Sequence, residues 1–339
     1  MRKDNPPPDP LLCDFDLPLQ AVFYLYGFAV RIATNSEEVL RAAEESWQSF
    51  RHEFSDPPAE LYFAVDEQGA QHCPPDPIFR GRRNLVTFIA DRANFVTCDL
   101  ARGLAFAWLS PGVAKNRAYL RYHFLESAAS ILVESLHLTP IHAACVVRDG
   151  HGVLLCGDSG AGKSSLAFAC ALRGWTLVTD DGSSLVRNRS ERIVLGNPYQ
   201  IRFREDAPDL FPELRQHTCR PRLNGEMAIE LATTTLPQIR TATRAPVDYV
   251  VFLDRKTSDL PSLIRFPQKK ALRWFEQVVT YGDHREAQRA SLRRLLTAEI
   301  YQFRYSDLDS AVRSLEGMVR DASDSQVDLA APCDERNHV

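Results

Sequence analysis

The sequence predicts an α/β fold built around a phosphate-binding loop, with an α+β module before it. The first observation is the segment "CGDSGAGKSS" (156–165), where Gly157, Gly162, Lys163 and Ser164 fit the spacing G-x-x-x-x-G-K-[ST]. The second is an apolar run that ends directly before the loop, and the third is a helical pattern that starts at Lys163. Strand, loop and helix therefore follow one another in the order that phosphate binding requires.

Composition narrows the class of protein. The chain has 339 residues, which is enough for two domains, and its net charge of -4 provides no general basic field for nucleic acid or an anionic membrane. We therefore expect no nucleic-acid partner and no membrane partner. The eight cysteines are scattered without a C-x-x-C pair, and the proline-rich start has no apolar signal core. These features predict a cytoplasmic protein.

The first part of the chain is predicted to hold the α+β module. Residues 1–18 are rich in proline and are expected to be a disordered start, and the module follows over 19–115. A strand is predicted over 21–33 and a helix over 36–50 with Ser36 as its N-cap. Short β-like runs separated by Gly, Pro, Asn and Asp complete the module.

The second part, residues 116–320, is predicted to be the phosphate-loop domain. It opens with a long amphipathic helix over 116–138. Two apolar runs, 141–147 and 152–156, are joined by "RDGH", in which Asp149-Gly150 is a strong hairpin signal. The phosphate loop therefore follows the second strand of a hairpin.

Further elements are predicted after the loop. A helix runs from Lys163 to a C-cap at Gly174, and a short apolar strand then ends at Asp180-Asp181. The remaining predictions are strands over 191–196, 199–204, 226–231, 248–255 and 300–305, helices over 269–297 and 307–320, and a flexible tail over 321–339.

The loop residues define a predicted nucleotide site. In such loops the backbone N–H groups surround the phosphates, the Lys reaches the β- and γ-phosphates, and the Ser or Thr hydroxyl binds Mg²⁺. We therefore expect ATP and Mg²⁺ as cofactors, with Lys163 on the phosphates and Ser164 on the metal. The expected nucleotide-binding residues are Gly157, Asp158, Ser159, Gly160, Ala161, Gly162, Lys163, Ser164 and Ser165.

Two neighbouring carboxylates are the second chemical signal. Asp180 and Asp181 end an apolar strand, where adjacent side chains point in different directions and can divide two tasks. One can accept a proton from an attacking hydroxyl while the other holds the metal. Asp254, at the end of a later apolar strand, is a rival metal ligand, and Glu230 is a further alternative.

Other polar residues allow two interpretations each. His142 lies in an apolar run, where histidine is more often a packed core residue than a site residue. Arg202 and Arg204 alternate along one strand, and they bind either a phosphate or acidic substrate, or neighbouring carboxylates on an exposed face. The basic segment 283–296 is interpreted as a solvated face or an oligomer contact.

The segment "IHAACVVRDGHGVLLCGDSGAGKSSLAFACALRGWTLVTDD" (141–181) resembles the catalytic domain of the HPr serine kinase/phosphorylase family. The shared features are a His-bearing strand, a hairpin, G-D-S-G-x-G-K-S, a helix ending in Arg-Gly and a strand closing with Asp-Asp. A weaker similarity covers "YQFRYSDLDSAVRSLEGMV" near the end of the chain. The family's E-[IV]-R-G-L-G segment after the Asp pair has no counterpart in this sequence.

The resemblance implies a mixed sheet of the kind shared by HPr kinases and phosphoenolpyruvate carboxykinases. It implies that Lys163 and Ser164 bind phosphate and Mg²⁺, that Asp180 is the base for an acceptor serine, and that Asp181 is a metal carboxylate. His142 becomes a candidate site residue, and the family relation also implies a homo-oligomer.

The leading functional hypothesis is an ATP-dependent phosphotransferase that acts on a hydroxyl, a serine of a protein or peptide. One alternative is a regulatory module that binds ATP without transfer, which the missing segment favours. A second alternative is a small-molecule kinase whose N-terminal module shapes the acceptor pocket.

Overall fold

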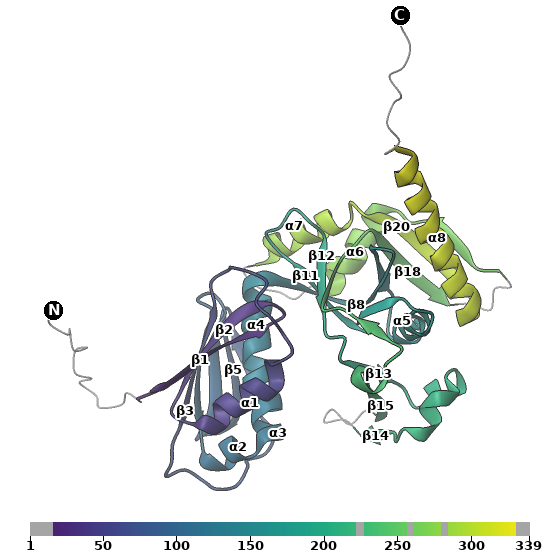
Figure 1. The fold of residues 1–339 in the computed structure, drawn as a ribbon. Helices are drawn as coiled ribbons and strands as arrows, with labels where there is room; N and C mark the ends of the chain where they lie inside the picture. Colours follow the sequence, from purple (N-terminus) through teal and green to yellow (C-terminus); the bar gives the residue numbers. More distant parts are fainter. Residues whose placement is uncertain (1–15, 222–226, 256–259, 279–283, 330–339) are drawn as a thin grey trace, which may run out of the picture. The chain divides into compact units, whose positions relative to one another are not determined.

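The computed structural model of the chain describes residues 16–221, 227–255, 260–278 and 284–329 (Figure 1). The chain divides into two compact units, Met1–His137 and Leu138–Val339. The sequence placed this division at 115/116, before the long helix. In the structure, the buried face of helix α4 (Glu126–His137) packs on strands of the N-terminal sheet. The helix therefore belongs to the first unit.

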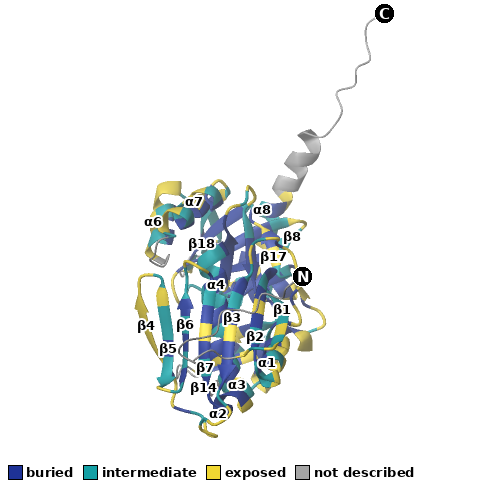
Figure 2. Cartoon of the chain, turned by 90° about the vertical axis from the view of Figure 1, so that its left-hand side faces the viewer, coloured by how far each residue is buried: buried dark blue, intermediate teal, exposed yellow. Residues whose placement is uncertain are grey.

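The first unit contains one seven-stranded sheet, in the order β1-β2-β3-β7-β6-β5-β4. Its strands are β1 (Leu19–Leu25), β2 (Phe28–Thr34), β3 (Ala59–Val65), β4 (Ile78–Arg82), β5 (Leu85–Asp91), β6 (Asn94–Asp99) and β7 (Leu104–Leu109). Strand β4 forms one edge and is exposed along its whole length (Figure 2). The middle strands and the helices that cover them carry buried residues of this unit.

Helices cover one face of this sheet. They are α1 (Glu37–Trp47), α2 (Pro111–Lys115), α3 (Arg117–Leu120), a π-helical turn (Arg121–Leu125) and α4. The predicted long helix therefore exists, but a π turn interrupts it. The predicted strand over 21–33 is wrong, because Tyr26 and Gly27 both adopt positive φ (53° and 88°) and turn the chain into a β1–β2 hairpin.

The second unit contains a ten-stranded mixed sheet, with the main order β17-β12-β11-β8-β9-β18-β20-β19; off this path, β10 pairs with β8 and β16 pairs with β10. Its strands are β8 (Leu138–Arg148), β9 (His151–Cys156), β10 (Thr176–Thr179), β11 (Gly182–Val186), β12 (Ile193–Gly196), β16 (Arg240–Thr241), β17 (Arg244–Pro246), β18 (Tyr249–Arg255), β19 (Ser262–Arg265) and β20 (Glu299–Tyr305). A smaller sheet joins β13 (Gln200–Phe203), β15 (Met227–Ala232) and β14 (Arg220–Pro221). Parallel and antiparallel pairs both occur, so the predicted α/β class with a mixed sheet is confirmed.

Strand β8 places the Asp pair at the same sheet edge as the phosphate loop. It pairs antiparallel with β9 through the predicted hairpin, and also antiparallel with β10 and β11. Strands β9 and β10 therefore run in the same direction and end at one edge of the sheet. Asp180 and Asp181 lie where the chain passes from β10 to β11, and the phosphate loop follows β9.

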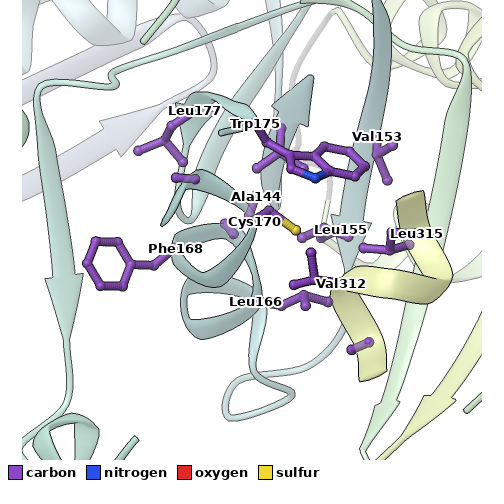
Figure 3. Packing of buried hydrophobic residues seen from close by; sticks show 14 of the residues in the cluster. Ala144, Val153, Leu155, Leu166, Phe168, Cys170, Trp175, Leu177, Val312 and Leu315 are labelled. Atoms are coloured by element: carbon purple, nitrogen blue, oxygen red, sulfur yellow. The ribbon is translucent and has the colours of Figure 1, made fainter. Parts of the chain in front are cut away.

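Helices pack on both faces of the larger sheet. Helices α5 (Lys163–Leu172) and α8 (Leu308–Leu329) share one core with β9, β18 and β20, and Figure 3 shows Leu166, Cys170 and Leu315 of these helices packed around Leu155 of β9. Helices α6 (Gln268–Val278) and α7 (Arg285–Leu295) share the core on the opposite face. Burial on both faces explains why the central strands read as continuous apolar runs.

Two predicted boundaries differ from the structure. Helix α8 continues to Leu329, so the predicted tail begins too early at 321, and its residues 330–339 lie outside the described part. The helical prediction over 269–297 corresponds to α6 and α7, with 279–283 outside the described residues. The predicted disordered start also lies largely outside them, at 1–15. Among the described residues, no helix is long and apolar enough to cross a membrane.

Candidate active site

The phosphate loop is a tight backbone turn between β9 and α5. Gly160 and Gly162 adopt φ of 86° and 93°, a region that residues with a Cβ rarely enter. The N–H of Ala161 donates to the carbonyl oxygen of Asp158 at 3.1 Å and closes the turn. A Cβ at Gly162 would lie 2.7 Å from the Tyr305 hydroxyl oxygen, so packing as well as conformation requires glycine there.

Lys163 lies across the loop and is only 5% exposed. Its Nζ donates to the carbonyl oxygens of Gly157 at 2.9 Å and Asp158 at 3.2 Å, and it lies 3.9 Å from Asp181 Oδ1. Burial lowers the pKa of this ammonium, while the Asp181 carboxylate opposes that shift. A buried ammonium whose hydrogen bonds go to neutral carbonyl oxygens is suited to bind an anion. A phosphate oxygen would give it a stronger, charge-assisted hydrogen bond than these carbonyl oxygens do.

Asp180 is 8% exposed at the end of β10. Burial raises the pKa of its carboxyl to about 6, and the hydrogen bond from the backbone N–H of Arg202 to Oδ2, at 2.9 Å, acts in the opposite direction. The backbone carbonyl of Asp180 accepts from the Ser164 hydroxyl at 3.2 Å, which ties β10 to the first turn of α5. A carboxyl with this pKa can change protonation near neutral pH.

Asp181 is half exposed and connects two other predicted site residues. His142 Nδ1 lies 3.3 Å from its Oδ1, and Lys163 Nζ lies 3.9 Å from the same oxygen. His142 reaches this position because its Cα pairs with Gly182 in the β8–β11 ladder. The structure therefore brings together His142, Lys163, Asp180 and Asp181. Ser165 follows in the first turn of α5.

Contacts from distant parts of the chain also reach the loop. Arg204 Nη2, just after β13, donates to the Ser159 hydroxyl at 2.9 Å, and Trp274 Nε1 of α6 donates to Asp158 Oδ1 at 3.3 Å. The Tyr305 hydroxyl of β20 donates to the Ala161 carbonyl oxygen at 3.3 Å. The sequence singled out Arg204 only as one of an alternating pair, and it carries no local signal for Trp274 or Tyr305.

The alternative metal carboxylates lie in other contacts. Asp254 Oδ2 accepts from Gln302 Nε2 at 2.9 Å and from Arg304 Nε at 3.3 Å, both on the neighbouring strand β20. Glu230 Oε1 accepts from Arg202 Nε at 3.1 Å across the smaller sheet. Within the described ranges there is no group of three or more His, Cys, Asp or Glu side chains arranged to hold a metal ion.

The residues of the loop fit a Mg²⁺-bound nucleoside triphosphate. The positive-φ glycines, the buried Lys163 and the start of α5 together form a site for an anion at a helix N-terminus. The Ser164 hydroxyl and the Asp181 carboxylate are oxygen donors of the kind Mg²⁺ accepts, and this ion commonly completes its shell with phosphate and water. A cluster of three protein carboxylates is therefore unnecessary for it.

These features define an α/β protein with a phosphate-binding loop and a carboxylate pair at one sheet edge. No known family model matches the chain. The chain is 37% identical over 112 residues to the HPr kinase/phosphorylase of Peptoclostridium acidaminophilum, which covers 31% of this chain and 36% of that protein. The resemblance to HPr kinase/phosphorylase is thus confirmed, and the chain spans about a third of the length of this curated relative.

A solved structure is also similar to part of the chain. It is the HPr(Ser) kinase/phosphatase from Coxiella burnetii, with 17% sequence identity, 55% of this chain and 97% of that chain covered, and a TM-score of 0.29. That score is too low for the two folds to be equated.

Proposed function

We propose that this protein is an HPr-kinase-like phosphotransferase that uses Mg-ATP to phosphorylate a hydroxyl group, most simply a serine of a protein or peptide. The observation that carries the proposal is Asp180. It is a buried carboxyl with a raised pKa of about 6, beside the residues that would hold the phosphates. The similarity to HPr kinase/phosphorylase supports the same reaction class.

Each residue then has a distinct role. Mg-ATP, when bound, supplies the phosphoryl group that is transferred. Asp180 accepts the proton of the acceptor hydroxyl, and the Arg202 N–H keeps its carboxylate oriented. Lys163 stabilises negative charge on the phosphates, and Ser164 with Asp181 would bind Mg²⁺. His142 orients Asp181 through their 3.3 Å contact.

The proposal is tested by transfer from γ-labelled ATP in the presence of Mg²⁺ and an extract of the source cells. Wild-type protein is compared with Asp180→Asn, which removes the base, with Lys163→Ala, which removes the phosphate ligand, and with the control Asp209→Asn. Asp209 is an exposed aspartate outside the site, so this change matches the charge change without touching the loop.

We expect Asp180→Asn to retain ATP binding and to lose transfer by about 10²- to 10⁴-fold, the usual contribution of a general base. Lys163→Ala should lose both binding and transfer, and Asp209→Asn should match wild type. Transfer by Asp180→Asn within a few-fold of wild type would refute the base assignment. Label in a low-molecular-weight fraction would indicate a small-molecule kinase, and ATP binding without any label would favour a regulatory module.

A further inference from the structure

We propose that Arg204 is a phosphate-binding residue of this site, and that it contacts the terminal phosphate of the bound nucleoside triphosphate. This inference rests on the proposed function, because it assumes that a nucleotide occupies the loop. It adds a residue that directly follows β13 of the small sheet to a loop that follows β9 of the larger sheet. Arg204 would make the site selective for a triphosphate over a diphosphate.

The first argument is the position of the guanidinium. Arg204 Nη2 lies 2.9 Å from the Ser159 hydroxyl oxygen, at the tip of the phosphate loop. Its Nη1 lies 3.7 Å from the place where Gly160 would carry a Cβ. The guanidinium therefore lies against two successive loop residues, where it can reach a ligand that is bound in the loop.

The second argument is electrostatic. Arg204 and Lys163 both lie against the phosphate loop, Arg204 at the Ser159 hydroxyl and Lys163 at the carbonyl oxygens of Gly157 and Asp158. Two cations near one another repel, and this arrangement becomes favourable when an anion lies between them. Within the described ranges, the Ser159 hydroxyl is the hydrogen-bond acceptor found for the Arg204 side chain, and no carboxylate lies within ion-pair distance. A neutral hydroxyl leaves most of the guanidinium donors available for phosphate oxygens.

The third argument is the contrast with Arg202, which lies two residues earlier, within β13. Its Nε donates to Glu230 at 3.1 Å, directly across the β13–β15 ladder, so its charge is already compensated. The sequence left two interpretations open for both arginines, binding of a phosphate or acidic substrate and pairing with carboxylates on an exposed face. The structure separates them, with Arg202 in a structural ion pair and Arg204 at the loop.

The test is calorimetric titration of the full chain with Mg-ATP and with Mg-ADP. The variants are Arg204→Gln, which removes the charge and the fork, and Arg204→Lys, which keeps the charge alone. Arg215→Gln is the control, because Arg215 is an exposed arginine of the same unit outside the loop. Thermal melts of each variant verify folding. Because Arg204 is exposed, its substitution should leave the fold intact.

We expect Arg204→Gln to weaken ATP binding by about tenfold or more, as for the loss of a charged hydrogen bond, and to change ADP binding by less than about threefold. Arg204→Lys should recover part of the loss. Arg215→Gln should leave the affinity for both nucleotides unchanged. Equal loss for both nucleotides, or no loss, would overturn the assignment while leaving the kinase proposal intact. Absence of nucleotide binding by the wild-type protein would refute both proposals.

Discussion

At the scale of single residues, Asp180 combines a cost in stability with a benefit in chemistry. Burial raises its pKa from an ordinary value of 3.8 to about 6, so at neutral pH the folded protein holds a carboxylate in a poorly solvated place. The same shift makes the group a better proton acceptor for a hydroxyl. Residues of this kind often reduce the stability of the fold they serve.

The pH dependence of stability tests this interpretation of Asp180. Between pH 3.8 and about 6 the folded protein binds a proton at this site that the unfolded chain has released, so stability falls as the pH rises through that window. We expect Asp180→Asn to raise the free energy of unfolding by about 1 to 3 kcal/mol at pH 7.5. The gain should disappear below pH 4. Urea denaturation at both pH values measures it, and a less stable variant at pH 7.5 would contradict the prediction.

Catalysis should follow the same ionisation in the opposite sense. If Asp180 accepts the proton, the rate of transfer in wild type rises as the pH increases through about 6 and becomes level above it.

At the scale of elements, the turn from β9 through the loop into α5 is fixed by conformation and by packing at Gly162. Its φ is 93°, and a Cβ would lie 2.7 Å from the Tyr305 hydroxyl oxygen. Gly174, just after the same helix, has a similar φ of 84° but no atom within 4 Å of an added Cβ. The two glycines therefore separate the cost of conformation from the cost of contact.

We expect Gly174→Ala to destabilise the protein by about 1 to 2 kcal/mol, the cost of left-handed backbone alone. Gly162→Ala should cost more, and it should also lose nucleotide binding. In a Tyr305→Phe background the extra cost of Gly162→Ala should shrink, because the hydroxyl in close contact is gone. Urea denaturation of wild type, Gly162→Ala, Tyr305→Phe and the double variant measures this coupling. Gly174→Ala is measured beside them, and equal losses at Gly162 and Gly174 would argue against the contact.

Elements with local signals were predictable from the sequence, and contacts made only by folding were not. Asp149-Gly150, the loop spacing and the strand before Asp180 each fix a neighbouring piece of backbone, and the structure has all three. The β1–β2 turn was missed because Tyr26, a residue that rarely takes positive φ, gives no turn signal. Strand β11 was missed because it opens with Gly-Ser-Ser after the Asp pair, residues that are typical of turns.

The loop shows the same limit within the candidate site. Arg204 and Trp274 contact Ser159 and Asp158 across 45 and 116 positions of sequence. Their partners are set by how β13 and α6 pack, and no spacing within the chain encodes that. The roles of the predicted site residues stay predictions.

At the scale of the whole molecule, the chain consists of two units with separate sheets. Seven strands and their helices bury one set of apolar residues in Met1–His137, and the larger mixed sheet of Leu138–Val339 has a core on each face. The proposed nucleotide site lies within the second unit. A ligand that binds there stabilises the native form of that unit by mass action.

We therefore expect two unfolding transitions in calorimetry, of which Mg-ATP raises only one. At a concentration of 100 times its dissociation constant, the nucleotide should stabilise the second unit by about 2.7 kcal/mol. A fragment of residues 138–339 should reproduce the ATP-sensitive transition, and Lys163→Ala in the full chain should abolish the shift without moving the other transition. A single transition that moves as a whole with ATP would show that the two units unfold together, and the nucleotide site would then depend on both.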